Sequence, residues 1–266
     1  MSGYFAGFIA TPTKVRSFLE CSRKYWYSYI NPETRQKQPE KSYFTLGHHV
    51  HDALRDFLTL SPEERRPPVL FKLLEDRWLT KSGPEAGFTT PEEEATAKNK
   101  ALLMLKWFVE NEDWKDIKPV LLPNASDGKI PGFVWDPIGK NLAFGGVIDR
   151  MDRDLDGGLH IIDYKTGKHD VIDEWQLPIY AVLMGRRMNE PIAKTSYLFL
   201  HHGKRHTEEI TIEKNVETIK RVEEVVSRIP NSKNKEDFVC LLGDRCRHCD
   251  YLLELGFDPI TGKRIE

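Results

Sequence analysis

The run Gly158-Leu-His-Ile-Ile-Asp-Tyr-Lys-Thr-Gly167 decides the fold class of this chain. Its glycines bound a short apolar, β-branched segment, which is typical of a buried strand. Side chains alternate along a strand, so Asp163 and Lys165 should share one face at its end. An acid and a lysine held together at the mouth of a sheet are costly unless something binds there. A divalent metal beside a phosphate group would satisfy both.

A second acid, Asp149, lies fourteen residues before Asp163 and ends another apolar run, residues 143–148. If the two strands pair as a hairpin through residues 152–157, the two carboxylates converge on one point. Carboxylate oxygens in a concave site suit hard cations such as Mg²⁺ or Mn²⁺. The spacing therefore predicts a divalent-cation site.

Length and composition are those of a globular protein. The chain has 266 residues, 39% of them hydrophobic and 30% charged, and a net charge of −2. This length allows a full core, and we expect one domain over residues 1–266. No run approaches the ~18 apolar residues of a membrane helix, and the N-terminus lacks a signal-peptide pattern, so we expect a cytoplasmic protein with no membrane partner. The net charge gives no sign of a general nucleic-acid binder, but it does not exclude an enzyme with basic residues along one groove.

Periodicity and capping signals predict an α/β fold with a mixed central sheet flanked by helices. Helices are expected at residues 13–30, 43–59, 67–80, 91–112, 173–184 and 213–229, with Thr13 and Thr90 as N-caps and Gly185 as a stop. Pro178 should bend the fifth helix or delay its start. Strand-like segments lie at residues 118–123, 131–136, 141–151 and 158–165, followed by a hairpin of residues 194–202 and 206–212. The chain thus divides into a helical part (13–112), a catalytic core (118–229) and a tail (238–255).

One histidine in the helical part is a candidate for metal binding. His51 follows Gly47 by one turn on an apolar stripe, and it is either a satisfied core residue or a metal ligand. The neighbouring His48 and His49 are expected at the surface.

The first helix mixes Arg23, Lys24 and Tyr27 as a nucleic-acid contact would. In the alternative interpretation, the aromatic side chains pack inward and the cations are solvated.

All four cysteines fall in a ligand-like pattern. Cys240, Cys246 and Cys249 form a Cys-x5-Cys-x2-Cys cluster near one end, and Cys21 lies near the other. In a cytosolic chain such cysteines favour a metal site over disulfides. Four thiolates from the two ends could hold zinc or an iron–sulfur cluster. The alternative is four unrelated reduced thiols.

Taken together, these pieces resemble the RecB-like branch of the PD-(D/E)XK nuclease superfamily, in its iron–sulfur-containing type. The resemblance covers nearly the whole chain and rests on motifs in a fixed order. They are Cys-x-Arg-Lys-Tyr from Cys21, Gly-x-x-x-His from Gly47, Gly-x-Ile-Asp-Arg from Gly146, Asp-Tyr-Lys-Thr-Gly from Asp163, Gln-x-x-x-Tyr from Gln176, and the C-terminal cysteines. Each motif is weak alone, and their order argues against coincidence.

The resemblance implies a restriction-endonuclease-like core and a metal-dependent DNA nuclease. Ligands to one or two Mg²⁺ or Mn²⁺ ions would come from four residues: His51, Asp149, Asp163 and the backbone carbonyl of Tyr164. Lys165 would orient or activate the attacking water. Gln176 and Tyr180 would support the site from the neighbouring helix.

The resemblance also implies a [4Fe–4S] cluster, with zinc as the alternative. Cys21, Cys246 and Cys249 match the pattern, but the usual last ligand falls at Leu255, which cannot ligate. Cys240 could take that place.

The implied substrate is DNA, single-stranded or at ends, in repair, recombination or CRISPR adaptation. The chain has no Gly-x-x-x-x-Gly-Lys-[Ser/Thr] phosphate loop, so it would act alone or with a separate helicase or CRISPR integrase. The rival from another class is a catalytically silent DNA-binding or scaffolding subunit. The four intact residues His51, Asp149, Asp163 and Lys165 argue against that rival.

Overall fold

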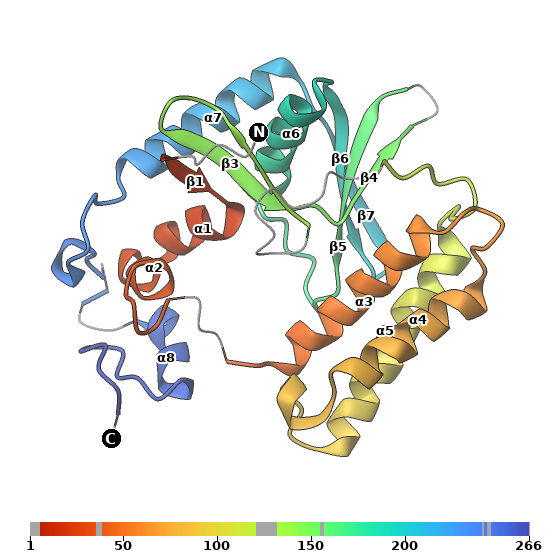
Figure 1. Ribbon diagram of the computed structural model, residues 1–266, viewed down its shortest axis with the longest axis horizontal. Coiled ribbons are helices and arrows are strands. Elements are labelled where there is room, and N and C mark those ends of the chain that lie inside the picture. The colour runs from red at the N-terminus through yellow and green to blue at the C-terminus, as the bar shows by residue number, and fades with distance from the viewer. Residues whose placement is uncertain are drawn as a thin grey trace.

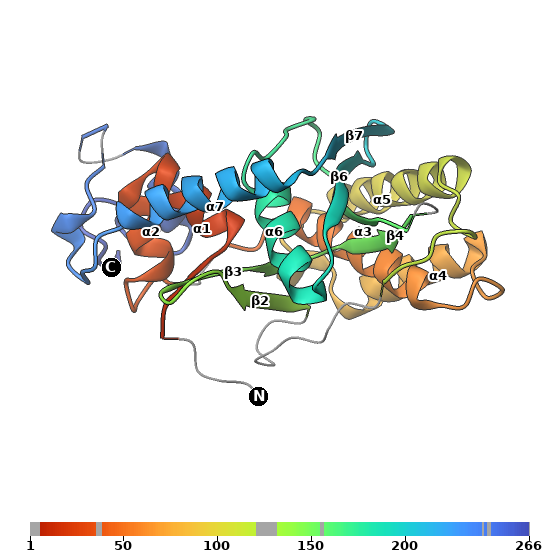
Figure 2. The ribbon, with the colours of Figure 1, turned by 90° about the horizontal axis from the view of Figure 1, so that it is seen from above.

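The computed structural model describes residues 6–35, 39–120, 132–154, 157–240, 242–243 and 246–265. Within these ranges, helices flank two mixed β-sheets, so the α/β fold that the sequence predicts is confirmed. Figure 1 and Figure 2 show two groups of helices, with α6 between them. Helices α3–α5 lie at one end of the molecule, and α1, α2 and α8 lie at the other.

The N-terminal region contains two short helices, α1 (Pro12–Glu20) and α2 (Ser22–Tyr29), where one helix over residues 13–30 was expected. The N-cap is Thr11, whose hydroxyl accepts a hydrogen bond from Lys14 N–H, and not Thr13. Pro12 occupies the first helical position, where no backbone donor is needed. Cys21 separates the helices because its backbone is extended (φ −166°, ψ 117°).

The helical layer consists of α3 (Ser42–Thr59), α4 (Pro67–Thr80) and α5 (Pro91–Asn111). The predicted start of α5 is confirmed: the Thr90 hydroxyl accepts from Glu93 N–H, and acidic residues fill the first turn. The predicted stripe of α5 is buried and consists of Ala97, Ala101, Met104, Leu105 and Phe108. This stripe packs in one hydrophobic cluster with residues of α3, α4 and the sheet.

The first sheet has the order β1-β3-β2, formed by β1 (Phe8–Ala10), β2 (Phe133–Pro137) and β3 (Leu142–Val147). The second has the order β4-β5-β6-β7, formed by β4 (Arg150–Arg153), β5 (Leu159–Lys165), β6 (Ile192–Phe199) and β7 (Lys204–Glu209). Strands β1 and β3, like β5 and β6, are parallel, and the other pairs are antiparallel.

The expected strand over residues 141–151 is divided between the two sheets. Strand β3 cannot pair with β5, as the hairpin hypothesis required, because β1 and β2 already occupy both of its edges. Of the two strands into which this segment divides, only β4 pairs with β5, with Arg150 opposite Ile162. Asp149 lies in the break between β3 and β4, where the chain passes from one sheet to the other.

The expected strand at residues 118–123 is present only as a short contact. Pro119 forms an isolated bridge with Asp152, and Val120 N–H donates to Met151 O at 2.7 Å. Residues 121–123 lie outside the described part of the chain.

Two helices after β5 differ from the sequence-based bounds. Helix α6 (Gln176–Met188) starts late, as expected, with Pro178 in its first turn, but it continues past Gly185 and ends at Asn189, which adopts φ 52°. Helix α7 (Ile212–Ser227) buries Thr218, Val222 and Val225, and Val216 is 61% exposed. Val216 is off the buried stripe because two residues correspond to a rotation of about 200° around a helix.

Strand β5 has both of its faces covered. Leu159 and Ile161 belong to the cluster that includes α6 and α7, whereas Ile162 and Tyr164 belong to the cluster of the helical layer. This alternation carries Asp163 toward α6 and Tyr164 toward α3–α5. None of the helices in the described part of the chain is long and apolar enough to span a bilayer.

Candidate active site

Asp163 and Lys165 meet at the C-terminal end of β5, as the sequence predicts. The Lys165 ammonium lies 2.7 Å from Asp163 Oδ2, and the Asp163 side chain is 5% exposed. The two residues share a face because one residue separates them on the strand.

Helix α6 supplies a glutamine that joins these two side chains. Gln176 Oε1 accepts from Lys165 Nζ at 2.6 Å, and Gln176 Nε2 donates to Asp163 Oδ1 at 2.8 Å. Gln176 Nε2 also lies 3.5 Å from the Tyr180 hydroxyl, one turn further along α6. Gln176 and Tyr180 of α6 thus lie beside Asp163 and Lys165.

His51 and Asp149 form a second pair beside the first. His51 Nδ1 lies 3.0 Å from Asp149 Oδ1, although α3 and the β3–β4 junction are far apart in sequence. The other carboxylate oxygen of Asp149 accepts the backbone N–H of Tyr164 at 2.9 Å. The structure thus brings together the helical histidine, the junction carboxylate and the backbone of β5.

Helix α3 can come this close to the end of β5 because it carries Gly47, which has no side chain, one turn before His51. A Cβ at Gly47 would lie 3.1 Å from Thr166 Oγ1, tighter than ordinary contact. The expectation that His49 is at the surface is wrong: it is 4% exposed, and its Nε2 lies 3.0 Å from Lys81 O. The ring of His49 on α3 packs edge-on against the ring of Trp78 on α4, so His49 is buried between the two helices. His48 is exposed, as expected.

The two carboxylates differ in their pKa values. Burial and the nearby charge of Asp149 raise the pKa of Asp163 to about 7, even though Lys165 acts in the opposite direction. Burial also acts to raise the pKa of Asp149, but His51 and the Tyr164 N–H outweigh it and lower the value. The same pairing raises the pKa of His51 against the effect of its burial. The charged forms of Asp149 and His51 are thus favoured, whereas burial and the charge of Asp149 disfavour the ionised form of Asp163.

The donor atoms fit a divalent cation. Asp163 Oδ2 is buried and accepts no hydrogen bond within the described residues, although the Lys165 ammonium lies beside it. Carboxylate and carbonyl oxygens with an imidazole nitrogen suit Mg²⁺ or Mn²⁺. A dication at this point would relieve the repulsion that raises the pKa of Asp163.

Sequence reasoning missed Tyr197 of β6. Its ring centroid lies 4.8 Å from Lys165 Nζ, and its hydroxyl donates to Asp173 O at 2.8 Å. Tyr197 is the residue of β6 opposite Asp163, so only the strand register could have revealed it.

Comparison with protein-family models gives a match to the PD-(D/E)XK nuclease superfamily over residues 10–252. The chain belongs to this superfamily. Its members are generally nucleases that use divalent metals, which agrees with the donor atoms around Asp163. A search of curated proteins finds no match to the chain.

This PD-(D/E)XK chain has a second group of potential metal ligands, formed by cysteines from its N-terminal and C-terminal regions. The Sγ atoms of Cys21, Cys246 and Cys249 all lie within 4.8 Å of one another, and the three residues are buried. Cys240 is buried in the same cluster and interacts with the thiols of Cys21 and Cys246. Leu255 packs against the cluster from the side. The sequence pattern therefore located a group of thiols that could bind a metal.

The thiols of this group have divergent pKa values. The hydrogen bond from Cys249 lowers the pKa of Cys21 to about 4, against the effect of burial. Burial raises the pKa of Cys246 to about 11. Binding of a metal by this group would release the protons of the remaining thiols.

The three N-terminal candidates for DNA contact are engaged within the protein. Tyr27 is 0% exposed, and its hydroxyl donates to Pro259 O at 3.2 Å, so it is not available for contact with nucleic acid. Arg23 Nε donates to Phe238 O at 2.7 Å, and Lys24 Nζ donates to Glu20 at 2.6 Å. Tyr27 points inward because it packs against the cysteine cluster, as the alternative interpretation predicted.

Proposed function

We propose that the protein is a Mg²⁺- or Mn²⁺-dependent deoxyribonuclease of the RecB-like branch, acting on single-stranded DNA or DNA ends. The observation that carries the proposal is the contact of Lys165 with Asp163 and Gln176, beside the pair His51–Asp149. A protein that only binds DNA has no need of a lysine held against a buried carboxylate. The Asp-x-Lys spacing is also the arrangement named in the superfamily motif.

The residues that would hold the metal are His51, Asp149, Asp163 and the carbonyl of Tyr164. When bound, a divalent cation supplies positive charge at the phosphate and lowers the pKa of a water molecule. Asp149 is already oriented by the Tyr164 N–H, and Asp163 by Gln176, so both carboxylates are fixed in place.

Lys165 would act on the phosphate. Gln176 Oε1 and the ring of Tyr197 hold its ammonium at the end of β5. An ammonium fixed in this way opposes the negative charge that develops on a phosphodiester in the transition state, without a cost of reorganisation. The N–H donors of the ammonium would also orient the attacking water by hydrogen bonding.

A group of basic side chains beside Lys165 supports a polyanionic substrate. We call it the basic edge, and it comprises Lys100, Lys168, His201 and His202. Leu200 N–H donates to Lys165 O at 2.9 Å, so the chain that leaves β6 runs beside the active site. His202 Nε2 lies 2.7 Å from Lys168 O, which brings the two loops together. Burial and the neighbouring cations lower the pKa of His201, so the lysines carry most of the positive charge, and Asp170 lies 3.8 Å from His202. Lysines grouped in this way attract a phosphate backbone.

We also propose that Cys21, Cys240, Cys246 and Cys249 hold a [4Fe–4S] cluster, with zinc as the alternative. Many structural zinc sites use two pairs of cysteines that are close in sequence. This chain instead has one cysteine near the N-terminus and three near the C-terminus, and this spacing favours the iron–sulfur cluster. A pathway in repair, recombination or CRISPR adaptation, with a helicase or integrase as partner, rests on the ordered motifs alone.

The test is digestion of labelled single-stranded and double-stranded DNA by the purified protein, with and without Mn²⁺. Cleavage that requires Mn²⁺ supports the proposal. Binding of DNA without cleavage in any divalent metal would instead support the catalytically silent subunit.

A further inference from the structure

The proposed metal ligands come from two different layers of the fold. His51 lies on α3 of the helical layer, whereas Asp149 and Asp163 belong to the sheet side. The hydrogen bond from His51 to Asp149 is a contact across this interface. The geometry of the site therefore depends on how firmly the two layers are held together.

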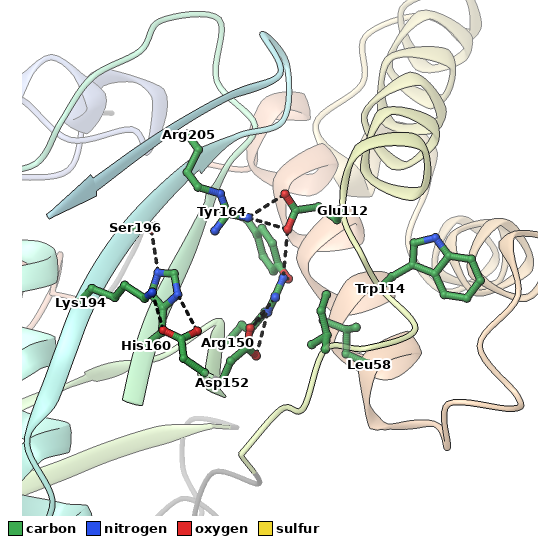
Figure 3. A network of polar contacts seen from close by, with 12 residues as sticks. Leu58, Glu112, Trp114, Arg150, Asp152, His160, Tyr164, Lys194, Ser196 and Arg205 are labelled. Carbon is green, nitrogen blue, oxygen red and sulfur yellow. Dashed lines mark hydrogen bonds and ion pairs between the residues drawn. The ribbon is translucent and has the colours of Figure 1, made fainter. Parts of the chain in front are cut away.

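A buried polar network joins the same two layers a short distance from the site (Figure 3). Its centre is Arg150, which is 6% exposed and donates to both oxygens of Asp152 at 2.8 and 2.9 Å through Nε. Arg150 Nη1 lies 3.4 Å from the Tyr164 hydroxyl and 3.7 Å from Glu112 Oε2. Strand register explains the arrangement, because Arg150 and Tyr164 lie on the face of the sheet that meets α3–α5.

Glu112 closes the network from the helical layer. It follows α5 directly, and its carboxylate accepts two hydrogen bonds from Arg205 of β7 at 2.6 and 2.7 Å. The network thus contains two arginines and two carboxylates, with the Tyr164 hydroxyl beside Arg150. The Arg150 and Asp152 side chains are buried, whereas that of Arg205 is 33% exposed. The buried pair is costly to break, since the charge left alone would lose its partner in a medium of low dielectric.

Tyr164 connects this network to the site through its own atoms. Its hydroxyl meets Arg150, its ring packs 5.9 Å from the ring of His51, and its backbone N–H holds Asp149. Arg150 is also the residue next to Asp149 in the chain. A displacement of the Tyr164 ring would therefore affect the ring of His51, and a displacement of its backbone would affect the carboxylate of Asp149.

We propose that Arg150, Tyr164 and Glu112 are positioning residues that hold His51 of the helical layer against the carboxylates of the sheet. This inference rests on the proposed metal-dependent function. Arg150 and Tyr164, at the centre of the network, are buried and so offer no surface to substrate. The effect of the network on the reaction is therefore on metal affinity and not on DNA binding.

The test uses Tyr164→Phe, which removes only the hydroxyl, and Glu112→Gln, which keeps the shape of the side chain. Binding of Mn²⁺ is measured by electron paramagnetic resonance of the free ion, without DNA. We expect each variant to raise the Kd for Mn²⁺ by about tenfold, the lower end of the effect of losing a residue that orients a ligand. Cleavage should recover at high Mn²⁺ concentration, with an unchanged KM for DNA.

Tyr251→Phe is the matched control, because its hydroxyl lies 3.1 Å from Ser28 Oγ in another part of the fold. A Kd for Mn²⁺ in Tyr164→Phe and Glu112→Gln equal to that of the wild type, or raised equally in Tyr251→Phe, would overturn the inference. Failure of the proposed function is a separate outcome, since it appears as a wild-type protein that cleaves no DNA at any Mn²⁺ concentration.

Discussion

Gly146 of β3 lies against the ring of Tyr180 so closely that a Cβ at this position would come within 2.3 Å of Tyr180 Cε1. Tyr180 in turn lies one turn from Gln176, which holds Asp163 and Lys165. The absence of a side chain at Gly146 therefore sets how near α6 approaches the site.

Gly146→Ala should displace α6 and lower both stability and cleavage. We expect a loss of about 1–3 kcal/mol in the free energy of unfolding, the usual cost of overpacking a core. Urea denaturation measures it. Gly139→Ala is the matched control, because a Cβ at Gly139 meets no atom within 4 Å. Equal stability of both variants would contradict the assigned role of Gly146.

Much of this site could be predicted from local pattern. Alternation along β5 placed Asp163 and Lys165 on one face, and helical spacing placed Gln176 beside Tyr180. These relationships depend only on the geometry of one strand or one helix.

Relationships between distant elements could not be predicted in this way. The break between β3 and β4 depends on β1 and β2 already covering both edges of β3. The burial of His49 depends on Trp78 of another helix, and the place of Tyr197 depends on the register of β6. Each of these three features depends on a contact with a segment distant in sequence, which local patterns do not reveal.

A pH dependence of stability follows from His160. Burial lowers its pKa to about 4 from 6.5, and Asp154 offsets only part of this effect. Above pH 6.5 the histidine is neutral in both states. As the pH falls from 6.5 toward 4, only the unfolded chain binds the proton, so the free energy of unfolding decreases, by about 2 kcal/mol at pH 5.

His160→Gln should remove this decrease. The measurement is the difference between the free energies of unfolding at pH 7 and pH 5, from urea titrations of the variant and the wild type. His169→Gln, at an exposed position, should retain the wild-type difference. The same pH dependence in His160→Gln as in the wild type would show that other groups cause it.

Cys21→Ser should lower both bound metal and thermal stability. Cys21 joins α2 to the C-terminal cysteines, so a metal held there closes a loop of more than two hundred residues. Elemental analysis of protein prepared without oxygen should give about four irons with acid-labile sulfide per chain.

Ser22→Ala, at the next residue, is the control and should retain the metal and the melting temperature. One zinc without sulfide would replace the iron–sulfur assignment by a zinc site. Protein without either metal would leave the four cysteines as reduced thiols.

The basic edge should govern the salt dependence of DNA binding. The triple variant Lys100→Ala, Lys168→Ala, His201→Ala should weaken binding of single-stranded DNA and flatten the plot of log K against log salt concentration. Fluorescence anisotropy at several salt concentrations measures both effects. Lys72→Ala is the control, because Lys72 is an exposed lysine on α4, paired with Asp76.

Arg23→Ala with Lys24→Ala provides a comparison for the other candidate surface. Both side chains are engaged within the protein, so we expect a smaller change in the salt slope than at the basic edge. If the salt slope is unchanged in the triple variant but reduced in this double variant, DNA binds along α2 and not along the basic edge.

The central claim is that Asp163 and Lys165 form the centre of a metal-dependent nuclease, and variants of these two residues test it most directly. The measurement is the rate of Mn²⁺-dependent cleavage of labelled single-stranded DNA by the wild type, Asp163→Asn, Lys165→Ala and the control His48→Ala, with folding checked by thermal melting. We predict that the rate falls by about 10²–10³ in Lys165→Ala, as when one electrostatic contact to the transition state is lost. Asp163→Asn should lose at least as much, whereas His48→Ala, at an exposed position, should cleave like the wild type. A wild-type rate in folded Asp163→Asn or Lys165→Ala would contradict the account.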